Sequence, residues 1–185
     1  GVGSDGRIVV VGTAKGDVLA FSAADGKALW QAKVSSEILA PPAVSDDGVA
    51  VRSGDNRVFL LDWSDGRRKW MYQRATPPLA LRSTAAPVFA ERYVFVGYPG
   101  GKLVALDLKN GAPVWEGAVA LPKGATELER VADIVSLPAI DGRQVCAVAY
   151  QGRVACFDLG QGGALIWARD FSSAAGIALD GRYLF

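Results

Sequence analysis

The sequence predicts an all-β protein, a β-propeller of four-stranded blades, because one tryptophan-ended repeat recurs along it and only short apolar runs separate its turns. A glycine turn followed by a tryptophan occurs four times and ends at Trp30, Trp70, Trp115 and, more loosely, Trp167. The intervals between these tryptophans are 40, 45 and 52 residues. Repeats of this length that contain only short strands are typical of propellers, in which each repeat forms one blade.

The elements of each repeat follow in the same order. A short strand rich in small residues and proline opens the repeat, since the crowded axis of a propeller favours small side chains and proline suits the start of a strand. An apolar strand, a glycine-bearing hairpin and a third strand come next, and the third strand ends in an aspartate at Asp62, Asp107 and Asp158. Each aspartate can accept N–H groups of the turn that follows, where a glycine supplies positive φ.

The fourth strand of each repeat carries the tryptophan. Strands that are apolar on both faces suit a blade that is packed between two others. We therefore expect the repeated tryptophans to fill the gaps between neighbouring blades. Trp63 is out of register with the repeat and is expected at the surface.

These repeats predict a single, partial propeller domain with about four blades. Because both ends of the sequence fall inside a repeat, we interpret the chain as a fragment of a longer protein. The expected parts of the domain 1–185 are a partial blade without an opening strand over 1–30, blades over 31–70, 71–115 and 116–167, and the start of another blade over 168–185.

The composition argues against several classes of function. A net charge of +1 predicts no nucleic-acid partner, and the apolar runs are far shorter than the roughly 18–20 residues of a membrane-spanning helix. The chain contains no histidine, which excludes histidine-based catalytic triads and histidine-ligated metal. The carboxylates of Glu127, Glu129 and Asp133 are interpreted as solvated loop charges rather than as an acid–base pair. We expect no catalytic residue, no bound metal and no cofactor.

Two cysteines flank the turn around Gln151. If that turn is a hairpin loop of two or four residues, Cys156 faces Ala147, and the sulfurs of Cys146 and Cys156 point to opposite faces of the sheet. We therefore expect two small buried side chains here; a disulfide would require a bulge in the hairpin.

Two segments depart from the repeat. Residues 76–83 hold two leucines and an arginine where the other repeats have small or polar residues, and residues 122–133 are an insertion. Insertions in repeat proteins lie in loops on one face, which is often the binding face. Thr126 and Glu129 have the spacing of a capping box, which favours a single helical turn.

The repeat itself resembles a known type. Residues 100–115 read as a glycine turn, a strand ending in Ala-Leu-Asp, a further glycine and tryptophan, which is similar to the PQQ-like (WD40-like) repeat. Quinoprotein dehydrogenases and the BamB family both use this repeat. The chain resembles the BamB family over essentially its whole length, including residues 79–87 and 126–133.

This resemblance implies an eight-bladed ring and a non-catalytic scaffold. Members of the BamB family are lipoproteins of the outer-membrane β-barrel assembly (BAM) complex, which implies a periplasmic location at the outer membrane through a lipid anchor that we expect outside this fragment. The implied partners are the POTRA domains of BamA and, as a further candidate, unfolded outer-membrane proteins. Carried over by position, the residues that bind BamA are Leu79, Leu81, Arg82 and Asp133; Val135 stands where the family has a second acid.

Physical chemistry supports such a surface, because exposed leucines beside an arginine are typical of interface anchors. The competing interpretation is that Leu79 and Leu81 pack between blades and that Arg82 is simply solvated. For the whole chain, the alternatives are a fragment of a PQQ-dependent quinoprotein dehydrogenase, against which the lack of adjacent cysteines counts, and a generic propeller adaptor for another partner.

Overall fold

The computed structural model describes residues 1–185 and is built almost entirely of antiparallel sheets. Four sheets have four strands each, and in every one the strands lie side by side in the order of the chain. The first two sheets comprise β1 (Val2–Ser4), β2 (Ile8–Gly12), β3 (Asp17–Ser22) and β4 (Ala28–Lys33), then β5 (Ala43–Ser45), β6 (Gly48–Arg52), β7 (Arg57–Leu61) and β8 (Arg68–Gln73). The next two comprise β9 (Val88–Ala90), β10 (Tyr93–Tyr98), β11 (Lys102–Asp107) and β12 (Pro113–Ala118), then β13 (Ala139–Asp141), β14 (Gln144–Val148), β15 (Arg153–Asp158) and β16 (Ala164–Asp170).

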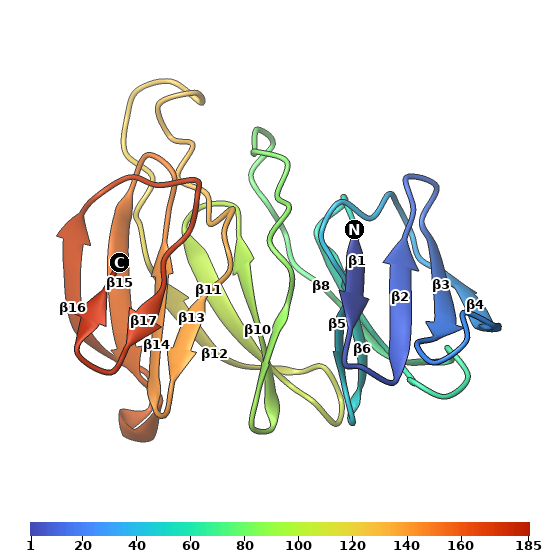
Figure 1. Ribbon diagram of the computed structural model, residues 1–185. Coiled ribbons are helices and arrows are strands. Elements are labelled where there is room, and N and C mark those ends of the chain that lie inside the picture. The colour runs from blue at the N-terminus through green and yellow to red at the C-terminus, as the bar shows by residue number, and fades with distance from the viewer.

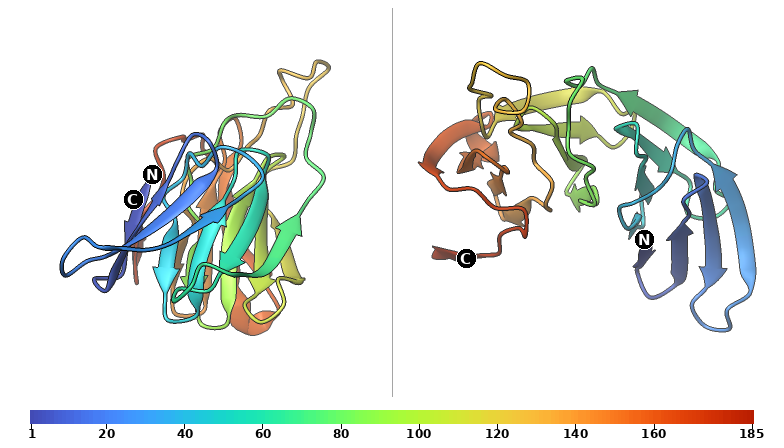
Figure 2. Two further views of the ribbon diagram at one scale, coloured as in Figure 1. Left: turned by 90° about the vertical axis from the view of Figure 1, so that its right-hand side faces the viewer. Right: turned by 90° about the horizontal axis from the view of Figure 1, so that it is seen from above.

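A fifth sheet contains two strands, β17 (Leu179–Asp180) and β18 (Tyr183–Leu184). The one helix is the 3₁₀ turn η1 (Leu159–Gln161), so the structure has no helix with the length and apolarity needed to cross a membrane. The four full sheets follow one another around an arc, with the first strand of each toward its inside (Figures 1 and 2). This arrangement is that of propeller blades, as the repeat predicts.

The first sheet differs from our expectation. We expected residues 1–30 to lack an opening strand, but β1 pairs with β2 through Val2, Gly3 and Ser4, so the first sheet is complete. β1 is only three residues long, and it is preceded by Gly1, whereas a proline directly precedes β5, β9 and β13. It therefore lacks the proline signal by which the other opening strands were predicted.

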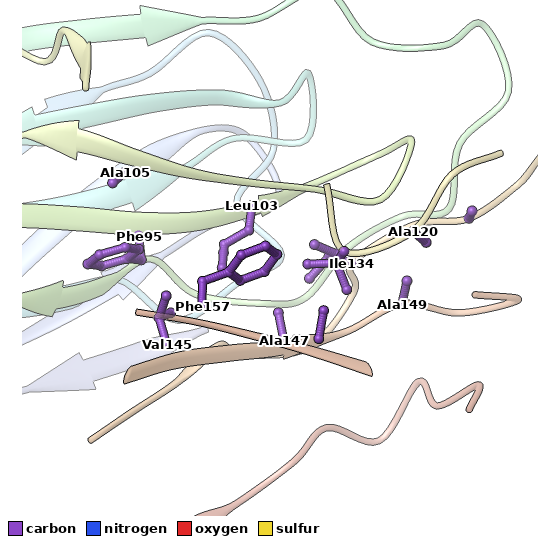
Figure 3. Packing of buried hydrophobic residues seen from close by; sticks show 12 residues of the cluster. Phe95, Leu103, Ala105, Ala120, Ile134, Val145, Ala147, Ala149 and Phe157 are labelled. Atoms are coloured by element: carbon purple, nitrogen blue, oxygen red, sulfur yellow. The ribbon is translucent and has the colours of Figure 1, made fainter. Parts of the chain in front are cut away.

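The core lies between the sheets, because alternate residues of each strand point to opposite faces. In the second sheet, Val49 and Val51 pack toward the first sheet, whereas Ala50 packs toward the third. A third cluster joins the third and fourth sheets, where Phe95, Phe157 and their neighbours interdigitate (Figure 3). Strands that are apolar on both faces are thus explained by burial on both faces.

Three of the four repeated tryptophans link neighbouring sheets, which confirms the position expected for them. Each of these three indoles donates its Nε1–H to a backbone carbonyl in the turn between the third and fourth strands of the next sheet. The pairs are Trp30 to Trp63 at 2.8 Å, Trp70 to Leu108 at 2.8 Å and Trp115 to Gly163 at 3.3 Å.

The turn after each third strand is also built as expected. Oδ1 of Asp62, Asp107 and Asp158 accepts a backbone N–H two residues later, at 2.8–2.9 Å. The side chain of Trp63 lies at the surface, 36% exposed, with the Arg7 guanidinium 5.0 Å from the centre of its ring.

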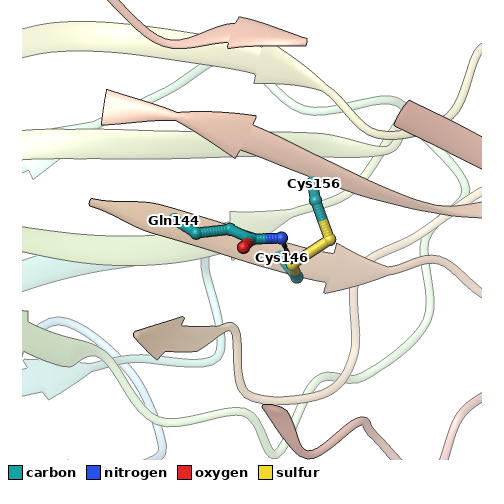
Figure 4. Close-up of a disulfide and its surroundings, with 3 residues drawn as sticks. All are labelled: Gln144, Cys146 and Cys156. Atoms are coloured by element: carbon teal, nitrogen blue, oxygen red, sulfur yellow. Dashed lines mark hydrogen bonds between the residues drawn. A yellow bond between two sulfur atoms is a disulfide. The ribbon is translucent and has the colours of Figure 1, made fainter. Parts of the chain in front are cut away.

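The cysteines correct a second expectation. Cys146 and Cys156 are directly paired across β14 and β15 and form a buried disulfide (Figure 4). The pairing of these strands extends to Ala149, whose N–H donates to Arg153 O at 3.1 Å. In the loop beyond this bond, Gln151 adopts a φ of 50°. The loop therefore has an odd number of residues, which moves the register by one from the expected pairing and brings both sulfurs to the same face.

Candidate interaction surface

The two irregular segments rise from the same side of the arc. One joins β8 to β9 and the other joins β12 to β13, and both project beyond the ends of the sheets (Figures 1 and 2). We call residues 79–83 the leucine segment. The insertion and this segment come from neighbouring blades, so the fold brings together two regions that the sequence separates by about forty residues.

The leucine segment presents apolar and cationic side chains to solvent. Leu79 is 43% exposed, Leu81 is 38% exposed, and the side chain of Arg82 is 80% exposed. The leucines therefore do not pack fully between blades, which was the competing interpretation. Exposed leucines beside an arginine form the composition expected of a protein-binding surface.

Asp133 occupies a different position. The resemblance to the BamB family implies a contact role and its loop location suggests a solvated charge, but Asp133 is only 1% exposed. Its Oδ2 accepts the Leu81 N–H at 2.7 Å, and its Oδ1 accepts the Gly100 N–H at 2.9 Å. The carboxylate thus holds the backbone of the leucine segment from below, while Leu81 itself faces outward.

A buried arginine that sequence reasoning missed lies close to Asp133. Arg52, at the end of β6, is 3% exposed. Its Nη1 donates to Ser83 Oγ at 3.1 Å, its Nη2 donates to Asn56 Oδ1 at 2.8 Å, and its guanidinium lies 5.4 Å from the centre of the Tyr98 ring. The signal was a charged residue ending an apolar strand.

Burial changes the protonation equilibria of this region. It lowers the pKa of the Arg52 guanidinium, an effect that the nearby Tyr98 and Asp133 oppose. It also raises the pKa of the Tyr98 phenol. An arginine remains charged under such conditions, because its intrinsic pKa is above about 12. A fixed positive charge therefore lies directly beneath the leucine segment.

Arg82 makes one ionic contact. Its Nη2 lies 3.4 Å from Oε1 of Glu37, in the connection between the first and second sheets. The pKa of Glu37 is lowered, first by the hydroxyl of Ser36 and then by its own backbone and by Arg82. Such an exposed pair is weak, so the Arg82 guanidinium remains available to a partner's carboxylate or carbonyl groups.

The tip of the insertion forms the expected helical turn. The Arg130 N–H donates to Thr126 O at 3.2 Å, Glu129 N–H donates to Thr126 Oγ1 at 3.2 Å, and Thr126 N–H donates to Glu129 Oε2 at 3.1 Å. These reciprocal bonds form a capping box, and the N–H groups lower the pKa of Glu129. Leu128 projects from the turn and is 69% exposed.

The three acidic residues of the insertion have separate roles. The Glu129 carboxylate caps the turn and the Asp133 carboxylate is bonded to backbone, so Glu127 is the one solvated acid of the three. The structure contains no group of three or more histidine, cysteine, aspartate or glutamate side chains placed to hold a metal ion.

The sequence pattern of one protein family, described as outer membrane protein assembly factor BamB, matches residues 1–185. The chain belongs to the BamB family. It is 50% identical over 185 residues to the outer membrane protein assembly factor BamB of Nitrosomonas eutropha, covering all of this chain and 45% of that protein. The chain spans about half the length of the curated relatives it matches.

Solved structures agree with this assignment. The crystal structure of BamB from Moraxella catarrhalis matches with a TM-score of 0.93 at 32% identity, over 100% of this chain and 56% of that one. The quinohemoprotein alcohol dehydrogenase of Comamonas testosteroni matches with a TM-score of 0.71 at 15% identity, over 92% of this chain and 34% of that one. The second match shows a shared propeller fold and nothing about activity.

Proposed function

We propose that this chain is part of a non-catalytic scaffold that assists the assembly of β-barrel outer-membrane proteins by binding the POTRA domains of BamA. The surface used is formed by Leu79, Leu81 and Arg82. The observation that carries the proposal is that these three side chains are exposed together on a segment whose backbone is held from inside by Asp133.

The physical properties of this surface suit a protein partner. Two leucines supply apolar area for the centre of an interface, and an arginine adjacent to them supplies directional hydrogen bonds. Because the segment is held before binding, little conformational entropy is lost when a partner docks. Asp133 contributes indirectly, by fixing the backbone that carries Leu81.

We place the protein at the periplasmic face of the outer membrane, held there by a lipid anchor. The outer-membrane location is inferred from the description of the family, outer membrane protein assembly factor BamB. The buried Cys146–Cys156 disulfide supports an oxidising compartment, since disulfides persist in the bacterial periplasm and are rare in the cytosol.

Binding of the purified protein to the isolated POTRA domains of BamA tests the proposal. We expect saturable binding that is lost in a Leu79→Ser, Leu81→Ser double variant. The matched control is Leu29→Ser, since Leu29 is 50% exposed on β4, in another sheet. Equal loss in the control, or a folded protein that does not bind, would contradict the proposal.

Unfolded outer-membrane proteins are a second proposed partner. Their binding is measured separately, with a denatured porin diluted into the protein. If the leucine segment serves BamA alone, the double variant retains binding to the unfolded porin, which separates the two partners.

A further inference from the structure

We infer that Arg52 is a positioning residue of the interaction surface: with Asp133, it holds the leucine segment in the conformation that presents Leu79, Leu81 and Arg82. The effect of Arg52 on partner binding rests on the proposed function. The role in holding the segment stands on the contacts of Arg52 alone.

The leucine segment makes no backbone hydrogen bonds to a neighbouring strand. None of the backbone–backbone hydrogen bonds of the structure involves residues 79–83, and the segment belongs to no strand. An extended chain without such bonds is held only by its side-chain contacts. Its conformation therefore depends on the few bonds that other elements supply.

Two buried, charged side chains supply these bonds, and they act at different points. Asp133 accepts the Leu81 N–H at 2.7 Å, and Arg52 donates to Ser83 Oγ at 3.1 Å. Both charged groups are at least 97% buried, where hydrogen bonds to ions are stronger than neutral ones. The third contact, between Arg82 and Glu37, is exposed and contributes little.

The geometry of the guanidinium explains why an arginine occupies this position. One nitrogen bonds Asn56 in the hairpin of the second sheet, another bonds Ser83 in the leucine segment, and the plane lies near Tyr98 of the third sheet. A lysine has a single nitrogen and no flat face, so it cannot make these contacts together. Arg52 thus connects the segment to two blades at once.

The experiment measures hydrogen exchange of the Leu81 amide, whose N–H is bonded to Asp133, in Arg52→Lys and Ser83→Ala. Ser83→Ala removes the acceptor on the segment side and leaves the buried charge in place, so it keeps the test valid if Arg52→Lys folds poorly. We expect exchange at Leu81 to become roughly tenfold faster in both variants, the effect of losing one charged hydrogen bond. At Leu81 the double variant should be no faster than Arg52→Lys alone, because both changes remove the Arg52–Ser83 bond. Ala85 is left out of this comparison, because Ser83→Ala also removes the acceptor of its N–H.

The matched control is Arg57→Lys. Arg57 lies five residues from Arg52 and its guanidinium bonds Gln73 at 3.1 Å within the second sheet, away from the leucine segment. Exchange of the Leu81 amide should stay at the wild-type rate in this control. Unchanged exchange in both Arg52→Lys and Ser83→Ala, with the proteins folded, would overturn the positioning role.

Binding to the POTRA domains of BamA is measured on the same variants. Faster exchange together with weaker binding supports both the positioning role and the surface. Faster exchange with unchanged binding would support the positioning role and overturn the proposed surface, so the two ideas fail in distinguishable ways.

Discussion

The indole Nε1–H of Trp70 donates to the backbone carbonyl of Leu108 at 2.8 Å, across the boundary between the second and third sheets. The same indole lies against Gly111, where a β-carbon would be 2.6 Å from the ring. Gly66 and Gly163 meet Trp30 and Trp115 in the same way. The glycine and the tryptophan of the repeat are therefore partners across blades, which accounts for their recurrence together.

Gly111→Ala tests this partnership. Gly111 and Gly26 share a φ of 71°, but a β-carbon on Gly26 would meet nothing within 4 Å. We expect Gly26→Ala to cost about 1 kcal/mol, the strain of a left-handed residue, and Gly111→Ala to cost about 3 kcal/mol because the indole must also move. Urea unfolding measures both free energies. Equal costs would mean that the indole contact is unimportant.

Trp70→Phe tests the hydrogen bond of the same pair. The variant leaves the Leu108 carbonyl without its donor and creates a cavity at the Trp70 position, where the native side chain belongs to a residue only 7% exposed. We expect a loss of about 2–4 kcal/mol in the free energy of unfolding. Trp63→Phe is the control, because the Trp63 side chain lies at the surface, and it should cost less than about 1 kcal/mol.

Reduction of the Cys146–Cys156 disulfide should lower the melting temperature. The bond closes a loop with a sequence separation of 10, for which chain entropy predicts a stabilisation of roughly 2–3 kcal/mol. Thermal unfolding with and without a phosphine reductant measures the difference. A Cys146→Ala, Cys156→Ala variant should melt at the lower temperature in both conditions. A melting temperature that reductant leaves unchanged in the wild-type protein would contradict a stabilising role.

Arg82→Glu should weaken binding to the POTRA domains of BamA by roughly tenfold without lowering the melting temperature. The Arg82 side chain is 80% exposed, so reversal of its charge changes the surface and leaves the core intact. Arg67→Glu is the control: its side chain is 88% exposed and it lies in the turn before β8, at the opposite end of that strand from the leucine segment. A parallel loss of stability in Arg82→Glu would show that Arg82 is structural.

Stability should fall in acid partly through Asp62. The hydroxyl and the backbone N–H of Ser64, followed by Lys69, lower the pKa of Asp62 from 3.8 to about 2. Because the folded-state pKa is lower than the unfolded one, this contribution is present above about pH 4 and is lost as the pH falls toward 2. Urea unfolding between pH 2 and 6 should show a smaller acid dependence in Asp62→Asn, and an intermediate one in Ser64→Ala, which keeps the backbone donor. Identical pH profiles in all three proteins would contradict this origin.

Features that depend on neighbours in the chain were determined by the sequence alone. The blade repeat is a matter of strand length and turn chemistry, so the tryptophans and the turn aspartates were predicted from their spacing. The capping box of Thr126 and Glu129 is a local contact over three residues, and it was likewise predicted. The residues alone left open whether Leu79 and Leu81 are exposed or pack between blades; their exposure, which the structure shows, was an implication of the resemblance to the BamB family.

Only the tertiary structure decided the features that depend on register and on long-range contacts. A difference of one residue in the length of the loop around Gln151 decides whether the two cysteines form a disulfide or remain unpaired. The periodicity of the sequence does not reveal that length. The Asp133 carboxylate meets Leu81 across 52 residues of sequence, and Arg52 meets Ser83 across 31. A charge in a loop or at a strand end is normally solvated. Here the leucine segment covers both Arg52 and Asp133, because the arc of blades brings the end of β6, the insertion and the leucine segment together.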